Sequence, residues 1–175
     1  MEEAKKAQEI LQSAMNMEKD GREFYLKSAR NSQTSVARNL FEVLAKEEIV
    51  HQEVISEIYE AIKAGNEWPD LRITPVHAEN AETIFSAALK DPQQEKAAAD
   101  DLEAVKIALK MEERAFKLYS DRAKESTHRA EEQFYLALAR EEQNHIISLR
   151  DTEEYLTDPE GWFMAKQHIT LDGAS

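Results

Sequence analysis

The sequence predicts an all-α protein in the form of a bundle of four long helices. Its composition favours long amphipathic helices, because 33% of the residues are charged, 42% are hydrophobic, and only 4 Gly and 4 Pro occur in 175 residues. Along four stretches, apolar residues recur at steps of three and four, and no run alternates cleanly as a strand does. A third observation is that the first half of this pattern recurs in the second half at a fixed offset.

The four predicted helices follow one another as two pairs. The first helix is expected at about 3–30, and the second runs to about Ala64, with Thr34 or Ser35 as its N-cap and Gly65 at its C-terminal stop. The other two are expected at about 94–125 and from Thr127 or His128 to about Leu156. Because only a few residues join the helices of each pair, each pair should form an antiparallel hairpin.

The chain is expected to divide into a bundle domain, residues 1–157, and a C-terminal segment, residues 158–175. The parts of the bundle domain are a hairpin at 3–65, a crossover at 66–93 and a second hairpin at 94–157. The crossover is long enough to run along the whole bundle, and it includes a short helical pattern from His77 to Lys90. The C-terminal segment should form a short helix whose Trp162 and Phe163 cover an apolar seam.

Charge and composition exclude several classes of protein. The formal net charge of −13 argues against nucleic acid and anionic membranes as partners. The absence of cysteine rules out disulfides, thiolate zinc sites and iron–sulfur clusters, so any metal must be bound by oxygen and nitrogen ligands. No apolar run is long enough for a transmembrane helix, and the N-terminus lacks the apolar core of a signal peptide, so a cytoplasmic location is expected.

The internal repeat has an offset of 94 residues. It superimposes Glu18 on Glu112, Tyr25 on Tyr119, Glu48 on Glu142 and His51 on His145. The residues between these positions mostly differ, so the match does not arise from low sequence complexity. A duplicated hairpin predicts a pseudo-two-fold axis between the two pairs of helices, and groups near that axis should meet their own copies.

The repeated acidic residues lie on the apolar stripes of their helices. Buried carboxylates are very unfavourable unless they are paired or bound to a metal ion, and Arg22 is the main inward candidate for a positive charge. Two divalent cations would neutralise four carboxylates, and two imidazoles would add neutral nitrogen ligands. Glu-x-x-His places both side chains on one helix face, as in bundles that hold two metal ions. The predicted ligands are Glu18, Glu48, His51, Glu112, Glu142 and His145.

Several neighbouring residues could also lie near these ligands. Glu47 and Glu141 also precede the histidines, but steps along the helix from Glu141 reach polar positions, so we expect them to be solvated. Tyr25 and Tyr119 each lie two turns from a predicted ligand and place a hydroxyl either near the metals or in the core. The remaining histidines, which have no repeat copies, are expected to be surface or structural residues; they are His77, His128 and His168.

Four segments carry a family resemblance: MEKDGREFY at 17–25, EEIVH at 47–51, MEERAFKLY at 111–119 and EEQNH at 141–145. With these segments the chain resembles the rubrerythrin group of the ferritin-like superfamily from about residue 5 to residue 156. The resemblance implies a ferritin-like bundle and a carboxylate-bridged di-iron centre in which Glu48 and Glu142 bridge the metals. It also implies reduction of hydrogen peroxide or reaction with dioxygen, and assembly into a homodimer or larger oligomer.

Two departures from that group have consequences. Without cysteine the chain lacks a rubredoxin domain, so its electron donor would be a separate protein or absent. The extra Glu that the group carries one turn after the third-helix ligand is Ala115 here, and its repeat copy is Gly21. We expect these small residues to leave room for an exogenous ligand such as azide or peroxide.

Three functions are compatible with this sequence. The favoured one is an oxidoreductase with two metal ions, most simply iron, with manganese or zinc as alternatives. The second is a non-catalytic protein that binds or stores iron. The third is a structural bundle whose site is incidental.

Overall fold

The computed structural model describes residues 2–69 and 98–172, with side chains described as far as residue 166 in the second range. Its helices are α1 (Glu2–Asn31), α2 (Ser35–Lys63), α4 (Ala98–Glu125), α5 (Arg129–Thr157) and α6 (Pro159–Asp172). Within these two ranges there is no strand, which confirms the predicted all-α class. The short helix predicted in the crossover lies outside the described residues.

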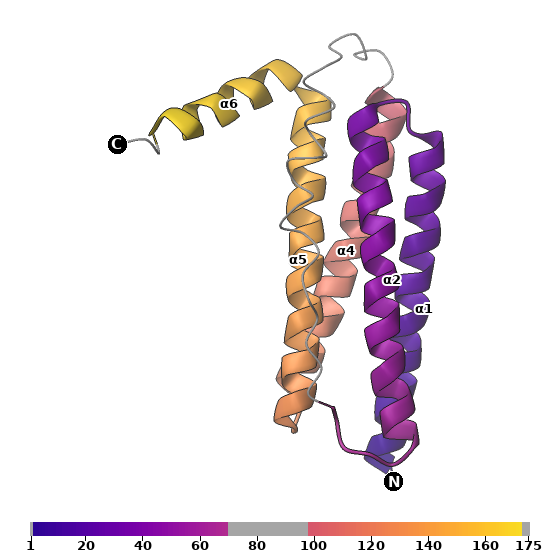
Figure 1. The fold of residues 1–175 in the computed structure, drawn as a ribbon. Helices are drawn as coiled ribbons and strands as arrows, with labels where there is room; N and C mark the ends of the chain where they lie inside the picture. The colour runs from indigo at the N-terminus through magenta and orange to yellow at the C-terminus, as the bar shows by residue number, and fades with distance from the viewer. Residues whose placement is uncertain (1, 70–97, 173–175) are drawn as a thin grey trace.

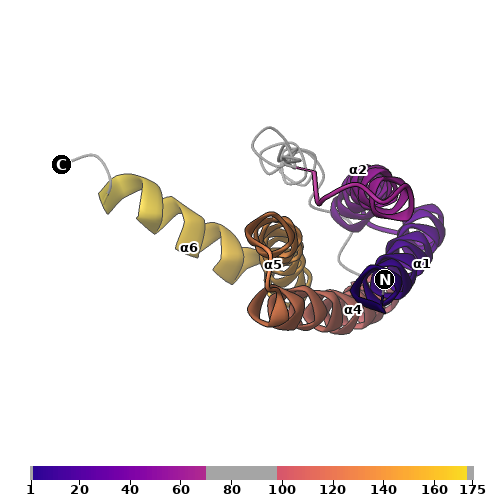
Figure 2. The same ribbon diagram turned by 90° about the horizontal axis from the view of Figure 1, so that it is seen from below.

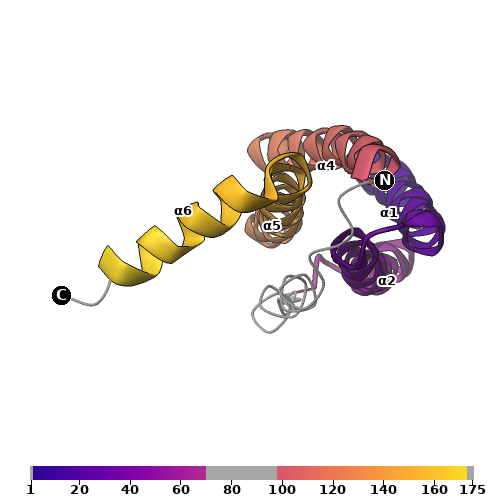
Figure 3. The same cartoon turned by 90° about the horizontal axis from the view of Figure 1, so that it is seen from above.

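The helices pair as two antiparallel hairpins, α1 with α2 and α4 with α5 (Figure 1). Seen along the bundle axis, the four helices stand side by side, with α1 next to α4 (Figures 2 and 3). Between the hairpins, α1 contacts α4 and α2 contacts α5. Each helix therefore has buried positions toward two neighbours, and residues from the middle of all four helices can meet.

Local signals set where the helices of the first hairpin end. Thr34 is the N-cap of α2, and its hydroxyl accepts a hydrogen bond from the Ala37 N–H at 3.3 Å. Gly65 follows α2 with a φ of 80°, a left-handed conformation that glycine adopts without a steric cost. The predicted stop at Gly65 is confirmed, and of the two predicted N-cap residues, Thr34 and Ser35, it is Thr34 that caps α2. The second hairpin differs, because the N-cap of α5 is His128 and its side chain forms no cap hydrogen bond.

The core consists of two apolar clusters along the bundle axis. One surrounds Tyr25 and Phe41 near the loop that joins α1 to α2, and the other surrounds Tyr119 and Tyr135 near the loop that joins α4 to α5. On each long helix, a pair of apolar residues from the two clusters flanks a buried Glu in sequence. The polar side chains predicted to bind metal therefore lie between the two apolar clusters.

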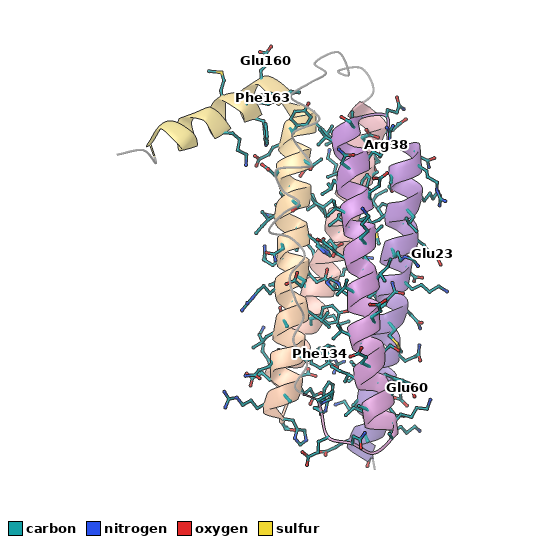
Figure 4. The ribbon with its side chains drawn as sticks, in the orientation of Figure 1. Glu23, Arg38, Glu60, Phe134, Glu160 and Phe163 are labelled. Atoms are coloured by element: carbon teal, nitrogen blue, oxygen red, sulfur yellow. The ribbon has the colours of Figure 1, made fainter. Side chains whose placement is uncertain are left out.

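Side chains on the long helices separate into inward and outward sets (Figure 4). Phe134 is 3% exposed, whereas Glu23 and Glu60 lie on the outer surface. None of the described helices combines the length and hydropathy that crossing a bilayer requires.

The C-terminal helix α6 points away from the bundle (Figure 1). Trp162 and Phe163 pack edge-on against Tyr155, with ring centroids 5.5 Å and 5.9 Å away, and the Trp162 indole donates a hydrogen bond to Asp151 at 2.8 Å. These aromatic residues thus cover Tyr155 near the C-terminal end of α5, and Tyr155 packs against the core cluster around Tyr25.

Candidate metal centre

The six predicted ligands converge in the middle of the bundle. Each of these residues is at most 3% exposed, although four of them are carboxylic acids. Two groups of these side chains have donor atoms close enough to share a metal ion. One group is Glu18, Glu48 and His51, and the other is Glu48, Glu112, Glu142 and His145. The helices therefore assemble two adjacent sets of oxygen and nitrogen donors.

The first set surrounds one ring nitrogen of His51. Its Nδ1 lies 3.3 Å from Glu18 Oε2, 3.5 Å from Glu48 Oε2 and 3.6 Å from Glu142 Oε1. The second set surrounds His145 in the same way. Its Nδ1 lies 3.3 Å from Glu142 Oε2, 3.5 Å from Glu112 Oε1 and 3.8 Å from Glu48 Oε1.

The two central carboxylates each face both histidines. Glu48 presents Oε2 to His51 and Oε1 to His145, while Glu142 presents Oε1 to His51 and Oε2 to His145. The two imidazole rings stack with centroids 5.4 Å apart and an interplanar angle of 22°. Two side chains that each divide their oxygens between two donor sets have the arrangement of bridging carboxylates.

Tyr25 and Tyr119 each form a hydrogen bond to a carboxylate of the opposite hairpin. The Tyr25 hydroxyl donates to Glu112 on the other hairpin, and the Tyr119 hydroxyl donates to Glu18. Both tyrosines are fully buried. Burial, together with the nearby carboxylate charges, raises the pKa of each phenol well above its usual value, so both remain protonated donors. Each terminal carboxylate is thereby held by the hairpin that does not carry it.

The carboxyl groups divide into two classes by pKa. Burial and the charge of Glu18 raise the pKa of Glu48 well above its usual value, and burial and the charge of Glu112 do the same for Glu142. Burial opposes ionisation of Glu112 as well. Hydrogen bonds and the charge of His145 outweigh it, so the pKa of Glu112 falls to about 2. The pKa of Glu18 is lowered in the same way against its burial, by hydrogen bonding to Glu48 and His51.

Both histidines are shifted toward the charged form. Burial by itself would lower their pKa values, but hydrogen bonding to Glu18 raises that of His51, and the charge of Glu112 raises that of His145. The raised pKa values of the two imidazoles and of the two central carboxyls favour their protonated forms, which reduces the buried negative charge.

The donor set fits metal ions better than it fits protons. Each Nδ1 faces three carboxylate oxygens, but a ring nitrogen carries at most one proton to donate. Glu48 Oε2 and both oxygens of Glu142 form no hydrogen bond with the described residues, despite being buried. Such orphaned acceptors are unfavourable in a dry interior. A cation between them would satisfy several at once.

The structure corrects one prediction. Glu47 and Glu141 were expected to be solvated, yet they are 2% and 4% exposed. Glu47 Oε2 lies 3.2 Å from Nε2 of His145, the ring nitrogen that faces away from the cluster. The prediction considered only one buried stripe on each helix. Because α2 and α5 contact each other as well as their hairpin partners, each has a second buried side. The repeated Glu-Glu pair, present at both copies, was the available signal.

The other candidate residues lie apart from the cluster. Arg22 is half-buried, and its Nε has no hydrogen-bond partner among the described residues. His128 is exposed at the loop before α5, as expected for a surface residue. His77 and the side chain of His168 lie outside the described part of the chain.

Comparison with known proteins agrees with the geometry. The model of the rubrerythrin family matches residues 9–153, which is most of the chain and includes all six side chains of the cluster. No curated protein and no solved structure gave a match. The buried group of carboxylates and histidines fits a metal site. The chain therefore belongs to the rubrerythrin family.

Proposed function

We propose that this protein is a carboxylate-bridged di-iron oxidoreductase that reduces hydrogen peroxide or dioxygen with electrons from a separate donor. One observation carries the proposal: Glu48 and Glu142 each divide their two oxygens between the two histidine-centred donor sets. Membership in the rubrerythrin family supports the same conclusion. A bundle that only needed buried polar packing would have no use for a doubled donor set.

In this proposal the two central carboxylates, two further carboxylates and two imidazoles would hold two metal ions. Glu18 and His51 would hold one ion, and Glu112 and His145 the other, since Glu18 faces Nδ1 of His51 at 3.3 Å and Glu112 faces Nδ1 of His145 at 3.5 Å. Carboxylate and imidazole ligands suit iron, with manganese and zinc as chemically reasonable alternatives. Four carboxylates neutralise two divalent ions, which would replace the protons that balance the cluster otherwise.

The protein's own residues orient the ligands and exclude water. Glu47 would accept a hydrogen bond from Nε2 of His145, which fixes the tautomer that leaves Nδ1 free to bind metal. Tyr25 and Tyr119 hold the terminal carboxylates. Two bound ferrous ions would supply the two electrons that, with two protons, convert hydrogen peroxide to two molecules of water.

Space for the oxidant is proposed beside Gly21. A Cβ added at this position would lie 3.5 Å from Glu48 Oε1, so the glycine faces a bridging carboxylate. Enlarging this position or its copy, as Gly21→Leu or Ala115→Leu, should slow reaction with peroxide and block azide binding. Gly21→Ala is the matched control, since 3.5 Å is an ordinary contact. Unchanged azide affinity and peroxide rate in both leucine variants would reject this route.

The proposed function is tested by stopped-flow oxidation of the anaerobic ferrous protein. Rapid oxidation by a stoichiometric amount of hydrogen peroxide is expected, followed by repeated turnover when a reductant is supplied. A Glu113→Gln variant should react like the wild type, because this side chain is about half exposed and pairs with Arg150 outside the cluster. Slow oxidation with accumulation of many iron ions per chain would instead indicate storage and contradict the proposal.

A further inference from the structure

The loops that join the helices of the two hairpins are repeat copies with matching backbone geometry. The Ser32 hydroxyl donates a hydrogen bond to the Ser28 carbonyl at 2.8 Å, and its copy, the Ser126 hydroxyl, donates to the Arg122 carbonyl at the same distance. The N-cap of α2 has φ −90° and ψ 147°, and the N-cap of α5 has φ −107° and ψ 128°. The N–H groups at the two helix starts are therefore presented in similar ways.

A carboxylate binds the N–H groups of the first loop. Asp101, in the first turn of α4, accepts hydrogen bonds from the Gln33 N–H at 3.1 Å, the Thr34 N–H at 2.8 Å and the Thr34 hydroxyl at 2.7 Å. A carboxylate is favourable at this place, because a helix N-terminus carries unpaired N–H donors and partial positive charge. The first loop therefore shows which group satisfies its two adjacent N–H donors.

The second loop has the corresponding donors but not the acceptor. Its two N–H groups belong to Thr127 and His128, the repeat copies of the two donor residues in the first loop. The position that corresponds to Asp101 is Ala7, whose side chain offers no acceptor. Neither of the two N–H groups forms a hydrogen bond with the described residues. This end of the bundle therefore presents the donors of a carboxylate site without a carboxylate of its own.

A cavity of about 600 Å³ lies at these donors, and its volume is within the usual range of small-molecule sites. Ala7 and both residues of the second loop line it. Apolar side chains form another part of its wall, and they are Ile10, Ile62 and Trp68. The first and last of these are half-buried, and Ile62 is buried. A ligand in the cavity therefore meets both directed N–H donors and an apolar surface.

A buried hydroxyl adds a further donor without a partner. Tyr135 is 1% exposed, and its hydroxyl forms no hydrogen bond with the described residues. Long side chains of a helix lean toward its N-terminus, so this hydroxyl lies toward the first turns of α5. Burial and the charge of Glu131 raise the pKa of the phenol, the charge of Arg122 lowers it, and both charged residues line the cavity. The Tyr135 hydroxyl therefore faces the same cavity. Its repeat copy is Phe41, which has no such donor.

Charged residues of both signs surround the cavity. Three basic residues line it, and none of their repeat copies is basic; the three are Lys6, Arg122 and Arg129. The acidic residues that line it are Glu3, Glu67, Glu125 and Glu131. Glu125 pairs with Arg122 at 2.8 Å, and all of these acids except Glu131 are exposed, so that water can satisfy them. The buried donor of Tyr135, by contrast, requires an acceptor.

We propose that this cavity is a binding site for a small monocarboxylate whose body is apolar. The carboxylate of the ligand accepts hydrogen bonds from the N–H groups of Thr127 and His128, as Asp101 does from the first loop. It also accepts one from the Tyr135 hydroxyl, since a carboxylate has enough lone pairs for all three donors. The apolar body lies against the side chains of Ile10, Ile62 and Trp68. None of the six side chains of the metal centre takes part, so this site is independent of the proposed function.

The first test is a titration of the full chain with benzoate, followed by nuclear magnetic resonance of the backbone amides. Zinc is added, because it is diamagnetic. The amide protons of Thr127 and His128 should shift downfield and saturate with a Kd on the order of 1 mM, an ordinary affinity for a ligand of so few atoms. The amides of Gln33 and Thr34 are the internal control. They should not move, since Asp101 already binds them.

Benzamide is the matched probe, because it has the shape of benzoate without the charge. It should bind at least ~10-fold more weakly, since hydrogen bonds to an ionised acceptor are stronger than those to a neutral one. Benzoate bound at the metal centre instead would leave the amides of Thr127 and His128 unmoved. The amide shifts therefore report on this cavity alone.

Ala7→Asp should supply the carboxylate from the chain itself. Without any ligand, this variant should move both amide protons downfield, as benzoate does in the wild type. It should also lower the affinity for benzoate at least ~10-fold and raise the thermal midpoint of unfolding by about 3 °C. Ala7→Val is the control, because valine adds a side chain of similar size without an acceptor. It should leave the two amide protons of the free protein in place.

Tyr135→Phe removes only a hydroxyl that has no partner, so the fold should persist. The affinity for benzoate should fall about 5-fold, which corresponds to the loss of one hydrogen bond. Tyr59→Phe is the control and should leave the affinity unchanged, since Tyr59 packs on the same core cluster without lining the cavity. Unmoved amides of Thr127 and His128, equal binding of benzoate and benzamide, or undiminished affinity in Ala7→Asp or Tyr135→Phe would each overturn the proposal.

Discussion

The two ends of the bundle are built from repeat copies of the same positions. Among the described residues, however, side-chain hydrogen bonds close one end, whereas a cavity lies at the other; we call them the closed end and the hollow end. At the closed end, Asp101 accepts hydrogen bonds from the Gln33 N–H at 3.1 Å, the Thr34 N–H at 2.8 Å and the Thr34 hydroxyl at 2.7 Å. At the other end the copy of Asp101 is Ala7, which lines the 600 Å³ cavity together with the loop before α5.

The centre between the two ends is symmetric by contrast. Each tyrosine donates to Glu18 or Glu112 on the opposite hairpin, and each central carboxylate, Glu48 and Glu142, faces both histidines. A buried carboxylate has no alternative to a matching donor or cation, so both halves carry the same solution. Backbone groups at the bundle ends can be satisfied by a side chain or by water, so the halves can differ there.

The largest expected effect is a loss of stability at the closed end. Asp101→Ala should lower the free energy of unfolding by about 3 kcal/mol, because it removes hydrogen bonds to a charged group and leaves the buried N–H and hydroxyl of Thr34 without their partner. Denaturant unfolding measures it. Thr127→Ala, in the corresponding loop of the other end, is exposed and should change stability by less than ~0.5 kcal/mol. A loss below about 1 kcal/mol in Asp101→Ala would mean that the closed end is no stronger than the hollow one.

The symmetric centre predicts equal effects from paired substitutions. Tyr25→Phe and Tyr119→Phe should each lower the free energy of unfolding in the presence of a chelator by about 2 kcal/mol, since each removes one hydrogen bond to a buried carboxylate. The same denaturant titration serves for both. Values that differ by more than about 1 kcal/mol, well beyond ordinary error in such measurements, would break the symmetry inferred for the centre.

The smallest expected effect is a gain at the hollow end. His128→Thr should raise the free energy of unfolding by about 1 kcal/mol, because it gives α5 the N-cap side chain that Thr34 gives α2. Thermal unfolding followed by circular dichroism measures the gain. His128→Ala controls for loss of the imidazole and should show none. Equal behaviour of the two variants would indicate that the loop geometry, and not the side chain, prevents capping.

Much of the fold could be predicted because its signals are local. The recurrence of apolar residues every three and four positions locates the helices, while Thr34 and Gly65 set the ends of α2. The 94-residue repeat identified all six side chains that converge in the centre, because burial and charge balance act on residues of known spacing. The division at residue 157 and the metal-binding role of the six side chains stay predictions.

The missed features depend on contacts between distant segments. The burial of Glu141 follows from a second helix neighbour, which a single stripe does not reveal. The bond from Thr34 to Asp101 joins residues 67 positions apart, and the edge-on contact between Tyr135 and Trp68 joins α5 to the segment that follows α2. The spacing of residues along one helix does not predict contacts between residues that are far apart in the sequence.

Metal content per chain is the most direct test of the central claim. The protein expressed in iron-replete medium should retain two metal ions per chain, measured by elemental analysis after gel filtration. A variant carrying Glu48→Ala and Glu142→Ala should retain none while keeping its helical circular dichroism, and Glu113→Gln should match the wild type. A wild-type chain without bound metal, or a double variant that keeps both ions, would contradict the account.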